Sequence, residues 1–171
     1  MTAAEESDQC PGSIDTAWKI HAALVDWTGK VDTKASFALT LESAALVTVV
    51  TLSSTAKPLA DLGGMALIAY RVGIALLGLG ALCAASVVSP RLRSRAMKRE
   101  SAENFIYFGH IKDWEPAALA TALRQDDVLA VLSRQLVAMS RIAWRKHRQV
   151  QWSLISGVTG ALIVAATGGL S

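Results

Sequence analysis

The chain has 171 residues, of which 52% are hydrophobic and only 6% are aromatic, and its formal net charge is +3. The apolar residues are mainly Ala, Val, Leu and Gly, and they gather into long runs. Runs of about 18 or more apolar residues predict membrane-spanning helices. A soluble helical bundle with a large core is the alternative, but it would place polar residues at every third or fourth position, and the run from Val72 to Val88 does not show that pattern. The composition therefore predicts an all-α membrane protein.

The apolar runs divide the chain into seven segments. Three transmembrane helices are predicted at residues 35–53, 66–88 and 151–170, each close to the roughly 20 residues that a ~30 Å hydrocarbon slab requires. Small residues in the second span allow another helix to approach closely, namely Gly73, Gly78 and Gly80. The remaining segments are an acidic flexible tail (1–12), a cytoplasmic helical stalk (13–34), an external hairpin (54–65) and a cytoplasmic sensing module (89–150).

Two long helices are predicted, and each has a stalk outside the membrane that continues into a span; the first stalk is residues 13–34 and the second lies in the module, from Val128. Apolar residues recur at three- and four-residue steps from residue 14, and nothing between Ser13 and Ser53 compels a break, so one long helix is predicted there. The segment from Val128 has a similar apolar face, which includes Ile142 and Val150, and it continues into the third span. Residues 1–35 carry six acids against three lysines, whereas residues 89–150 carry twelve bases against six acids. This complementary charge predicts that the two stalks are neighbours.

The basic residues also predict an orientation. Of the 17 Lys and Arg residues, all but Lys57 and Arg71 lie in the N-terminal stalk or in the central module. Under the positive-inside rule, the N-terminus and the module face the cytoplasm, and the C-terminus lies outside the inner membrane.

One acidic residue, Glu42, falls inside the first span. A carboxyl group about two turns inside the slab is expected to be protonated, paired or exposed to water. It is either a gating or pore-facing group, or a structural group that is hydrogen-bonded to a neighbouring helix through Ser43, Thr40 or a partner chain. Both interpretations stay open at this point.

No catalytic constellation is present in the sequence. The histidines at 21, 110 and 147 have no Cys or carboxylate partners at metal-ligand spacing, and there is no Gly-rich phosphate loop, nucleophile elbow or HExxH motif. We therefore expect no enzyme activity, no metal, no cofactor and no nucleic-acid partner.

Recognition chemistry is concentrated in the module. Aromatic faces stack on bases, and Arg and Lys neutralise phosphate. The candidate ligand-binding residues are Asn104, Tyr107, Phe108, His110, Trp114, Gln135, Ser140, Arg141 and Lys146. A structural alternative is that Phe105, Tyr107 and Phe108 fill the core of the module. For the basic run 91–99, contact with anionic lipid is favoured over contact with the ligand.

An ordered set of residues resembles the membrane-effector family of Pycsar antiphage systems. It comprises Trp27 with Asp32-Thr33-Lys34-Ala35, then Asn104-Phe105-Ile106-Tyr107-Phe108-Gly109-His110-Ile111, then Gln135-Leu136-Val137-Ala138-Met139-Ser140, and Lys146. The chain departs from the family pattern at His110, where an acid is usual, and near Glu42, where an amide is frequent. The candidate stalk and gating residues are Trp27, Asp32 and Lys34, which belong to this set, and Glu42 in the first span.

The resemblance implies a function. Such effectors respond to cyclic CMP or cyclic UMP, made by a partner pyrimidine nucleotide cyclase upon phage infection, and then impair the inner membrane. The leading hypothesis is therefore a ligand-gated, membrane-disrupting effector in contact with the lipid bilayer. Shifting a two-state equilibrium from 1% to 99% requires about 5.5 kcal/mol, so a homo-oligomer is expected to help. The alternatives are a non-gated membrane scaffold and a holin-like pore without a nucleotide ligand.

Overall fold

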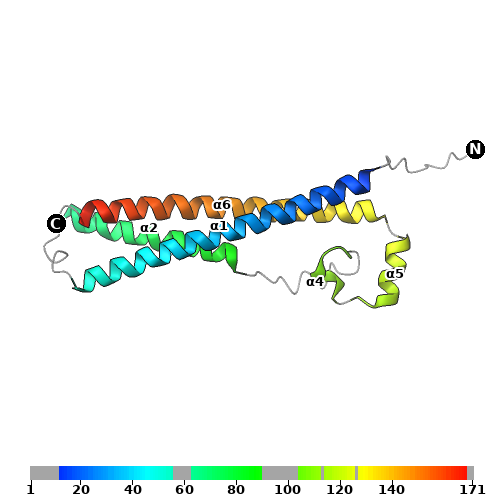
Figure 1. Ribbon diagram of the computed structural model, residues 1–171, viewed down its shortest axis with the longest axis horizontal. Helices are drawn as coiled ribbons and strands as arrows, with labels where there is room; N and C mark the ends of the chain where they lie inside the picture. The colour runs from blue at the N-terminus through cyan, green and yellow to red at the C-terminus, as the bar shows by residue number, and fades with distance from the viewer. Residues whose placement is uncertain (1–11, 56–62, 90–103, 113, 126, 169–171) are drawn as a thin grey trace, which may run out of the picture. The chain divides into compact units, whose positions relative to one another are not determined.

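The computed structural model describes residues 12–55, 63–89, 104–112, 114–125 and 127–168 (Figure 1). Within them the chain is helical and contains no strand: α1 (Ser13–Thr55), α2 (Met65–Val88), α4 (Phe108–Ile111), α5 (Pro116–Gln125) and α6 (Val128–Gly168). Three of these helices, α1, α2 and α6, are long and apolar enough to cross a membrane. The predicted tail up to residue 11, the hairpin residues 56–62 and the basic run 91–99 lie outside the described residues.

The chain forms two compact units. The head unit comprises residues 1–27 and 91–142, and the bundle unit comprises residues 28–90 and 143–171. Helices α1 and α6 contribute to both units, and each is continuous, as predicted. With 43 and 41 residues, they are about twice as long as the ~20 residues that a hydrocarbon slab needs. About half of each helix must therefore lie outside the slab if it crosses a membrane.

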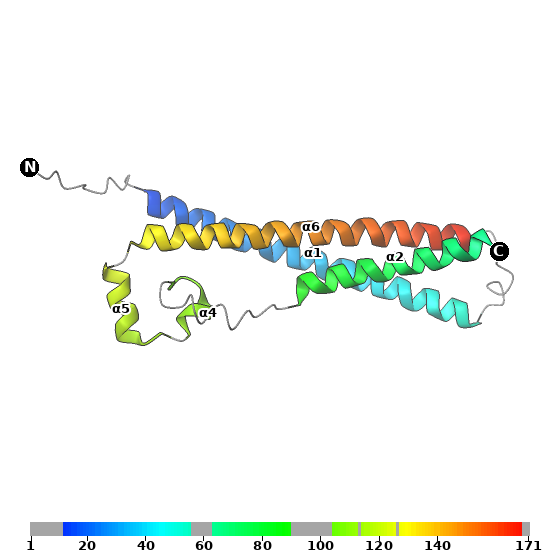
Figure 2. The ribbon, with the colours of Figure 1, turned by 180° about the vertical axis from the view of Figure 1, so that it is seen from behind.

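The bundle unit consists of α2 packed against the C-terminal halves of α1 and α6 (Figures 1 and 2). Buried positions recur at alternating steps of three and four residues. On α2 they are Tyr70, Gly73, Leu77, Gly80, Ala84 and Val87. On α1 they include Val31, Ala35, Ala38 and Glu42, and on α6 Val150, Ser153, Gly157 and Gly160. A mean spacing of 3.5 residues with small side chains is typical of closely packed left-handed helix pairs.

The closest approach within the bundle unit is between α2 and α6. A Cβ atom added at Gly160 would lie 2.6 Å from the carbonyl oxygen of Gly73 and 2.8 Å from the backbone nitrogen of Leu77. A Cβ added at Gly80 would lie 2.8 Å from a carboxylate oxygen of Glu42. The predicted close approach is thus confirmed at Gly73 and Gly80. It is wrong at Gly78, where an added Cβ would meet nothing within 4 Å.

The head unit has a small core of its own. Phe105, Ala122 and Val131 are buried together, and partly buried side chains pack against them: Ile106, Trp114, Leu119 and Val128. The carboxylate of Asp127 accepts hydrogen bonds from the backbone N–H groups of Leu129 and Ala130, at 3.0 and 3.2 Å, and so caps the start of α6. Phe105 fills this core, as the structural alternative predicted.

Two predicted core positions are exposed. Phe108 begins the short helix α4, and 68% of its surface is accessible, so it does not fill the core of the head unit. Ile142 was assigned to the apolar face of α6 but is 51% exposed. It follows the same three- and four-residue pattern as its buried neighbours, but lies at the margin of the stripe.

The glycine contact yields a prediction about stability. Gly160→Ala should lower the free energy of unfolding by about 1–3 kcal/mol, because the new methyl group would press on backbone atoms that cannot move aside. Gly78→Ala is the matched control, and it should leave stability unchanged or raise it by up to ~1 kcal/mol through helix propensity. Equilibrium unfolding in mixed detergent micelles measures both. Equal stability of the two variants would contradict the packing.

Candidate functional site

The structure divides the predicted site residues between the two units. The head unit holds most of the candidate ligand-binding residues and Trp27, which is 54% exposed. The bundle unit holds Asp32, Lys34, Glu42 and Lys146.

In the head unit, the aromatic block forms one cluster around α4. The Tyr107 ring lies 4.4 Å from the Phe108 ring and 5.5 Å from the His110 ring, the latter in an edge-to-face arrangement. Trp114 packs edge-to-face on Phe105 at 6.2 Å and belongs to the core. The cluster therefore presents the exposed Phe108 ring next to the Tyr107 and His110 rings, which are more buried.

His110 combines burial with an unsatisfied nitrogen. The residue is only 7% exposed, and its Nδ1 is the one buried side-chain nitrogen or oxygen in the described residues that lacks a hydrogen-bond partner. Leaving such a group unpaired costs about 1–3 kcal/mol. A molecule that placed a donor or acceptor at Nδ1 would recover this free energy. The sequence pattern did not predict this feature, because a histidine beside aromatic residues is usually satisfied.

The other head candidates lie before or after this cluster. Asn104 and Gln135 are half-buried, while Ser140 and Arg141 are exposed on α6. The Ser140 hydroxyl donates to the carbonyl oxygen of Val137 at 3.1 Å, a bond within its own helix. Because the Arg141 guanidinium is exposed, an anionic group can bind it without displacing a core contact.

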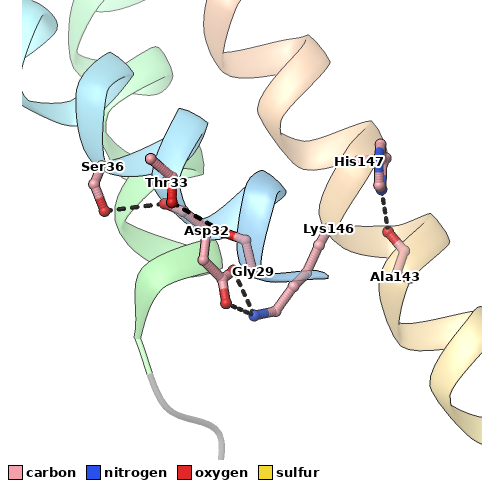
Figure 3. Close-up of polar contacts among 7 residues, drawn as sticks. All are labelled: Gly29, Asp32, Thr33, Ser36, Ala143, Lys146 and His147. Atoms are coloured by element: carbon pink, nitrogen blue, oxygen red, sulfur yellow. Dashed lines mark hydrogen bonds and ion pairs between the residues drawn. The ribbon is translucent and has the colours of Figure 1, made fainter. Parts of the chain in front are cut away.

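In the bundle unit, an ion pair joins α1 to α6 (Figure 3). The Lys146 ammonium donates to both carboxylate oxygens of Asp32, at 2.6 and 2.8 Å. The side chains are 24% and 40% exposed, so water screens the pair, and it contributes about 0–1 kcal/mol. Other bonds near the pair stay within single helices, such as those from Thr33 to Gly29 and from Ser36 to Asp32.

The ion pair confirms that the helices of the two predicted stalks, α1 and α6, are neighbours where Asp32 and Lys146 meet. Lys146 was predicted as a ligand contact and Asp32 as a stalk residue, but their pairing was not predicted, because 114 positions separate them. The pair shows that Asp32 of α1 and Lys146 of α6 lie opposite one another. Lys34, two residues after Asp32, is exposed.

Further along the same two helices, Glu42 is buried, with 7% of its surface exposed. The hydroxyl of Ser153 on α6 donates to its two carboxyl oxygens, at 3.0 and 3.2 Å. The structural interpretation expected a neighbouring helix but named the wrong donors. Thr40 instead donates to Ser36 in its own helix at 2.9 Å, and Ser43 is exposed.

Ser153 and Gly157 are the site residues that sequence reasoning missed. Both lie on the three- and four-residue pattern that continues from Val150, and a Cβ atom at Gly157 would clash with the Glu42 carboxyl group. This pattern was the signal in the sequence that could have identified them, because it places the Ser153 hydroxyl on the face of α6 that packs against the neighbouring helices. Of these residues only Glu42 is an acidic, His or Cys ligand, and no group of three such residues occurs in the described chain.

Comparison with known proteins supplies the family. The Pycsar effector protein domain, PycTM, matches residues 16–171, which is all of the chain except its first 15 residues. No curated protein matches the chain, and neither does any solved structure. The matched range includes the head cluster, the ion pair and Glu42. The chain belongs to the Pycsar effector family.

Proposed function

We propose that this Pycsar effector is a multi-pass protein of the inner membrane that impairs the membrane when it binds cyclic CMP or cyclic UMP. The observation that carries the proposal is the family match over residues 16–171, which implies an antiphage effector and a partner cyclase. Three helices long enough to cross a membrane support the location. Within this proposal the chain is the receiver of a signal and the agent of membrane damage, with no catalytic step of its own.

The proposed orientation places the head unit in the cytoplasm, where the cyclase product would be made. Fifteen of the seventeen Lys and Arg residues precede the first span or lie between the second and third spans, and such residues are retained on the cytoplasmic side. The C-terminus would then lie outside. The spans keep the boundaries predicted from the sequence, 35–53, 66–88 and 151–170.

The proposed ligand site is the aromatic block of the head unit. The exposed Phe108 ring, backed by Tyr107, offers a face on which a pyrimidine can stack, and stacking on an aromatic ring is worth about 1–3 kcal/mol per base. Nδ1 of His110 lacks a partner and can bond the base edge. Around this centre we place the remaining candidates: Asn104, Trp114, Gln135, Ser140 and Arg141, with Arg141 for the phosphate. A ligand-binding role for Lys146 stays a prediction.

The proposed output is a rearrangement of α1 against α6. In the bundle unit, the Asp32–Lys146 ion pair and the Glu42–Ser153 hydrogen bonds join these two helices. Any opening of the bundle between them must break both contacts. Trp27 and Lys34 flank the ion pair along α1 and are proposed as further gating positions. Assembly into a homo-oligomer would add the contact free energy that a single mononucleotide does not supply.

Leakage from vesicles tests the function. Proteoliposomes that contain the full chain should release dye upon addition of cyclic CMP or cyclic UMP, and not with linear CMP or UMP. Equal leakage with and without any nucleotide would support the holin-like alternative. Absence of leakage, together with absence of binding heat in calorimetry, would support the scaffold.

A variant of His110 tests the site. His110→Phe keeps an aromatic ring in the head but removes Nδ1, so the Kd for the activating nucleotide should rise about tenfold, as expected for a lost hydrogen bond of roughly 1–1.5 kcal/mol. His147→Phe is the matched control, because Nδ1 of His147 already bonds the carbonyl oxygen of Ala143. Calorimetry on the detergent-solubilised chain measures both. An unchanged Kd in His110→Phe would show that the base binds at another site.

A charge exchange tests the ion pair. Asp32→Asn should raise leakage in the absence of nucleotide by up to about fivefold, since a partly exposed pair is worth at most ~1 kcal/mol. The double variant Asp32→Lys with Lys146→Asp should restore low leakage. Asp15→Asn is the control, because the Asp15–Lys19 pair lies within α1 and is more exposed. Leakage that stays raised in the double variant would show that the charges act through another partner.

A further inference from the structure

The carboxyl group of Glu42 occupies the point where all three helices of the bundle unit meet. It extends from α1 to Ser153 on α6, and the backbones of Gly80 on α2 and Gly157 on α6 close around it. A methyl group at either glycine would collide with the carboxyl group or the adjacent chain. The group is therefore held in a tight cradle formed by backbone atoms and one hydroxyl.

The cradle does not satisfy an ionised carboxylate. Such a group accepts about four hydrogen bonds, whereas the Ser153 hydroxyl has a single hydrogen to share between its two oxygens, at 3.0 and 3.2 Å. Apart from Glu42 itself, no charged side chain described in the bundle unit lines the adjoining groove, and α2 contributes only Leu77 to it. An uncompensated charge at this depth costs several kcal/mol. A cation taken up by the site, a proton included, would remove this cost.

The ligands and the space around the carboxyl group decide which cation can bind there. A metal ion needs several oxygen ligands, and no group of three His, Cys, Asp or Glu residues that could hold one occurs in the described chain. A carbon atom added at Gly80 or Gly157 would clash, so no ion fits between the carboxyl group and these two backbones, and the adjoining groove is otherwise lined by apolar residues, whose side chains offer no ligand to a metal ion. A proton needs no added volume, and it converts one carboxyl oxygen into a donor. Of the simple cations, only the proton fits.

A groove leads from the outside of the bundle unit to this carboxyl group. Its volume is about 160 Å³, and Glu42 forms part of its wall. The other lining residues are all apolar, from α1, α2 and α6: Ala38, Leu41, Ala45, Leu77, Leu154, Gly157, Val158 and Ala161. Leu41 and Val158 are 69% and 58% exposed, so the groove opens on a surface that contacts lipid if these helices cross the membrane.

We propose that Glu42 is a proton-binding site of the membrane bundle, reached through this lipid-facing groove, and that its neutral carboxyl group holds α1 against α6. Loss of the proton would leave a carboxylate with one donor, and the bundle would favour arrangements in which Glu42 meets water. The site would make the closed bundle dependent on a proton. This property goes beyond the response to a nucleotide and does not require it.

A lipid-soluble carbodiimide tests both parts of the proposal in nucleotide-free proteoliposomes. Dicyclohexylcarbodiimide takes the proton of a carboxylic acid on its nitrogen while the carboxyl oxygen bonds to its central carbon, which gives an O-acylisourea. The acyl group then moves from this oxygen to a nitrogen of the same adduct, with cleavage of the new C–O bond, and the resulting N-acylurea is a stable mass tag. The tag should appear on Glu42 and should be lost in Glu42→Gln and in Ala161→Phe, which fills the groove. Ala166→Phe is the control for bulk, because Ala166 is exposed on the same helix but does not line the groove. A water-soluble carbodiimide should not tag Glu42.

Leakage of the same vesicles gives a second readout. Glu42→Gln keeps the shape of the neutral group, so leakage without nucleotide should stay low, whereas Glu42→Lys places a longer, basic side chain in the cradle and should leak. The proposal fails if Glu42 is not tagged, if the water-soluble reagent tags it equally well, or if the Gln and Lys variants leak alike. None of these outcomes depends on cyclic CMP or UMP, so the nucleotide response can fail or succeed independently.

Discussion

Close approach of helix backbones is the constraint on which the bundle unit depends. Gly73 and Gly160 bring α2 and α6 so near to each other that no side chain fits between them, and Gly80 and Gly157 leave a space that the Glu42 carboxyl group fills. In a membrane, burial of apolar surface does little to drive helices together, because lipid tails are as apolar as leucine. Packing of small residues and a few polar contacts must do that work instead.

The polar contacts add direction to this packing. Small residues allow helices to slide past one another, whereas a hydrogen bond or an ion pair fixes one register. Asp32 with Lys146 and Glu42 with Ser153 define the same pairing of α1 and α6 at two levels of the bundle unit. Each contact is weak or conditional by itself, since one is screened by water and the other has a single donor. A bundle held in this way can be stable and still change its arrangement when a charge appears or disappears.

The head unit is organised on a different principle. Its core of Phe105, Ala122 and Val131 resembles that of a small soluble domain, and an Asp127 cap begins the helix that leaves it. Next to this core, the structure leaves Phe108 exposed and the Nδ1 atom of His110 without a partner. Leaving a buried nitrogen unpaired costs the fold about 1–3 kcal/mol. In the proposed function, this is the entry point of the signal.

The sequence by itself determined the helices, their continuity and the family. Long apolar runs and three- and four-residue periods depend only on neighbouring residues, and so α1, α2 and α6 could be predicted closely, as could the adjacency of the oppositely charged stalks. Only the tertiary structure decided which residues meet. It paired Asp32 with Lys146 and Glu42 with Ser153, left Gly78 and Ile142 unpacked, and exposed Phe108 while it buried His110. These outcomes depend on the rotation and register of each helix against its neighbours, to which residues more than a hundred positions apart contribute, and no local pattern encodes them.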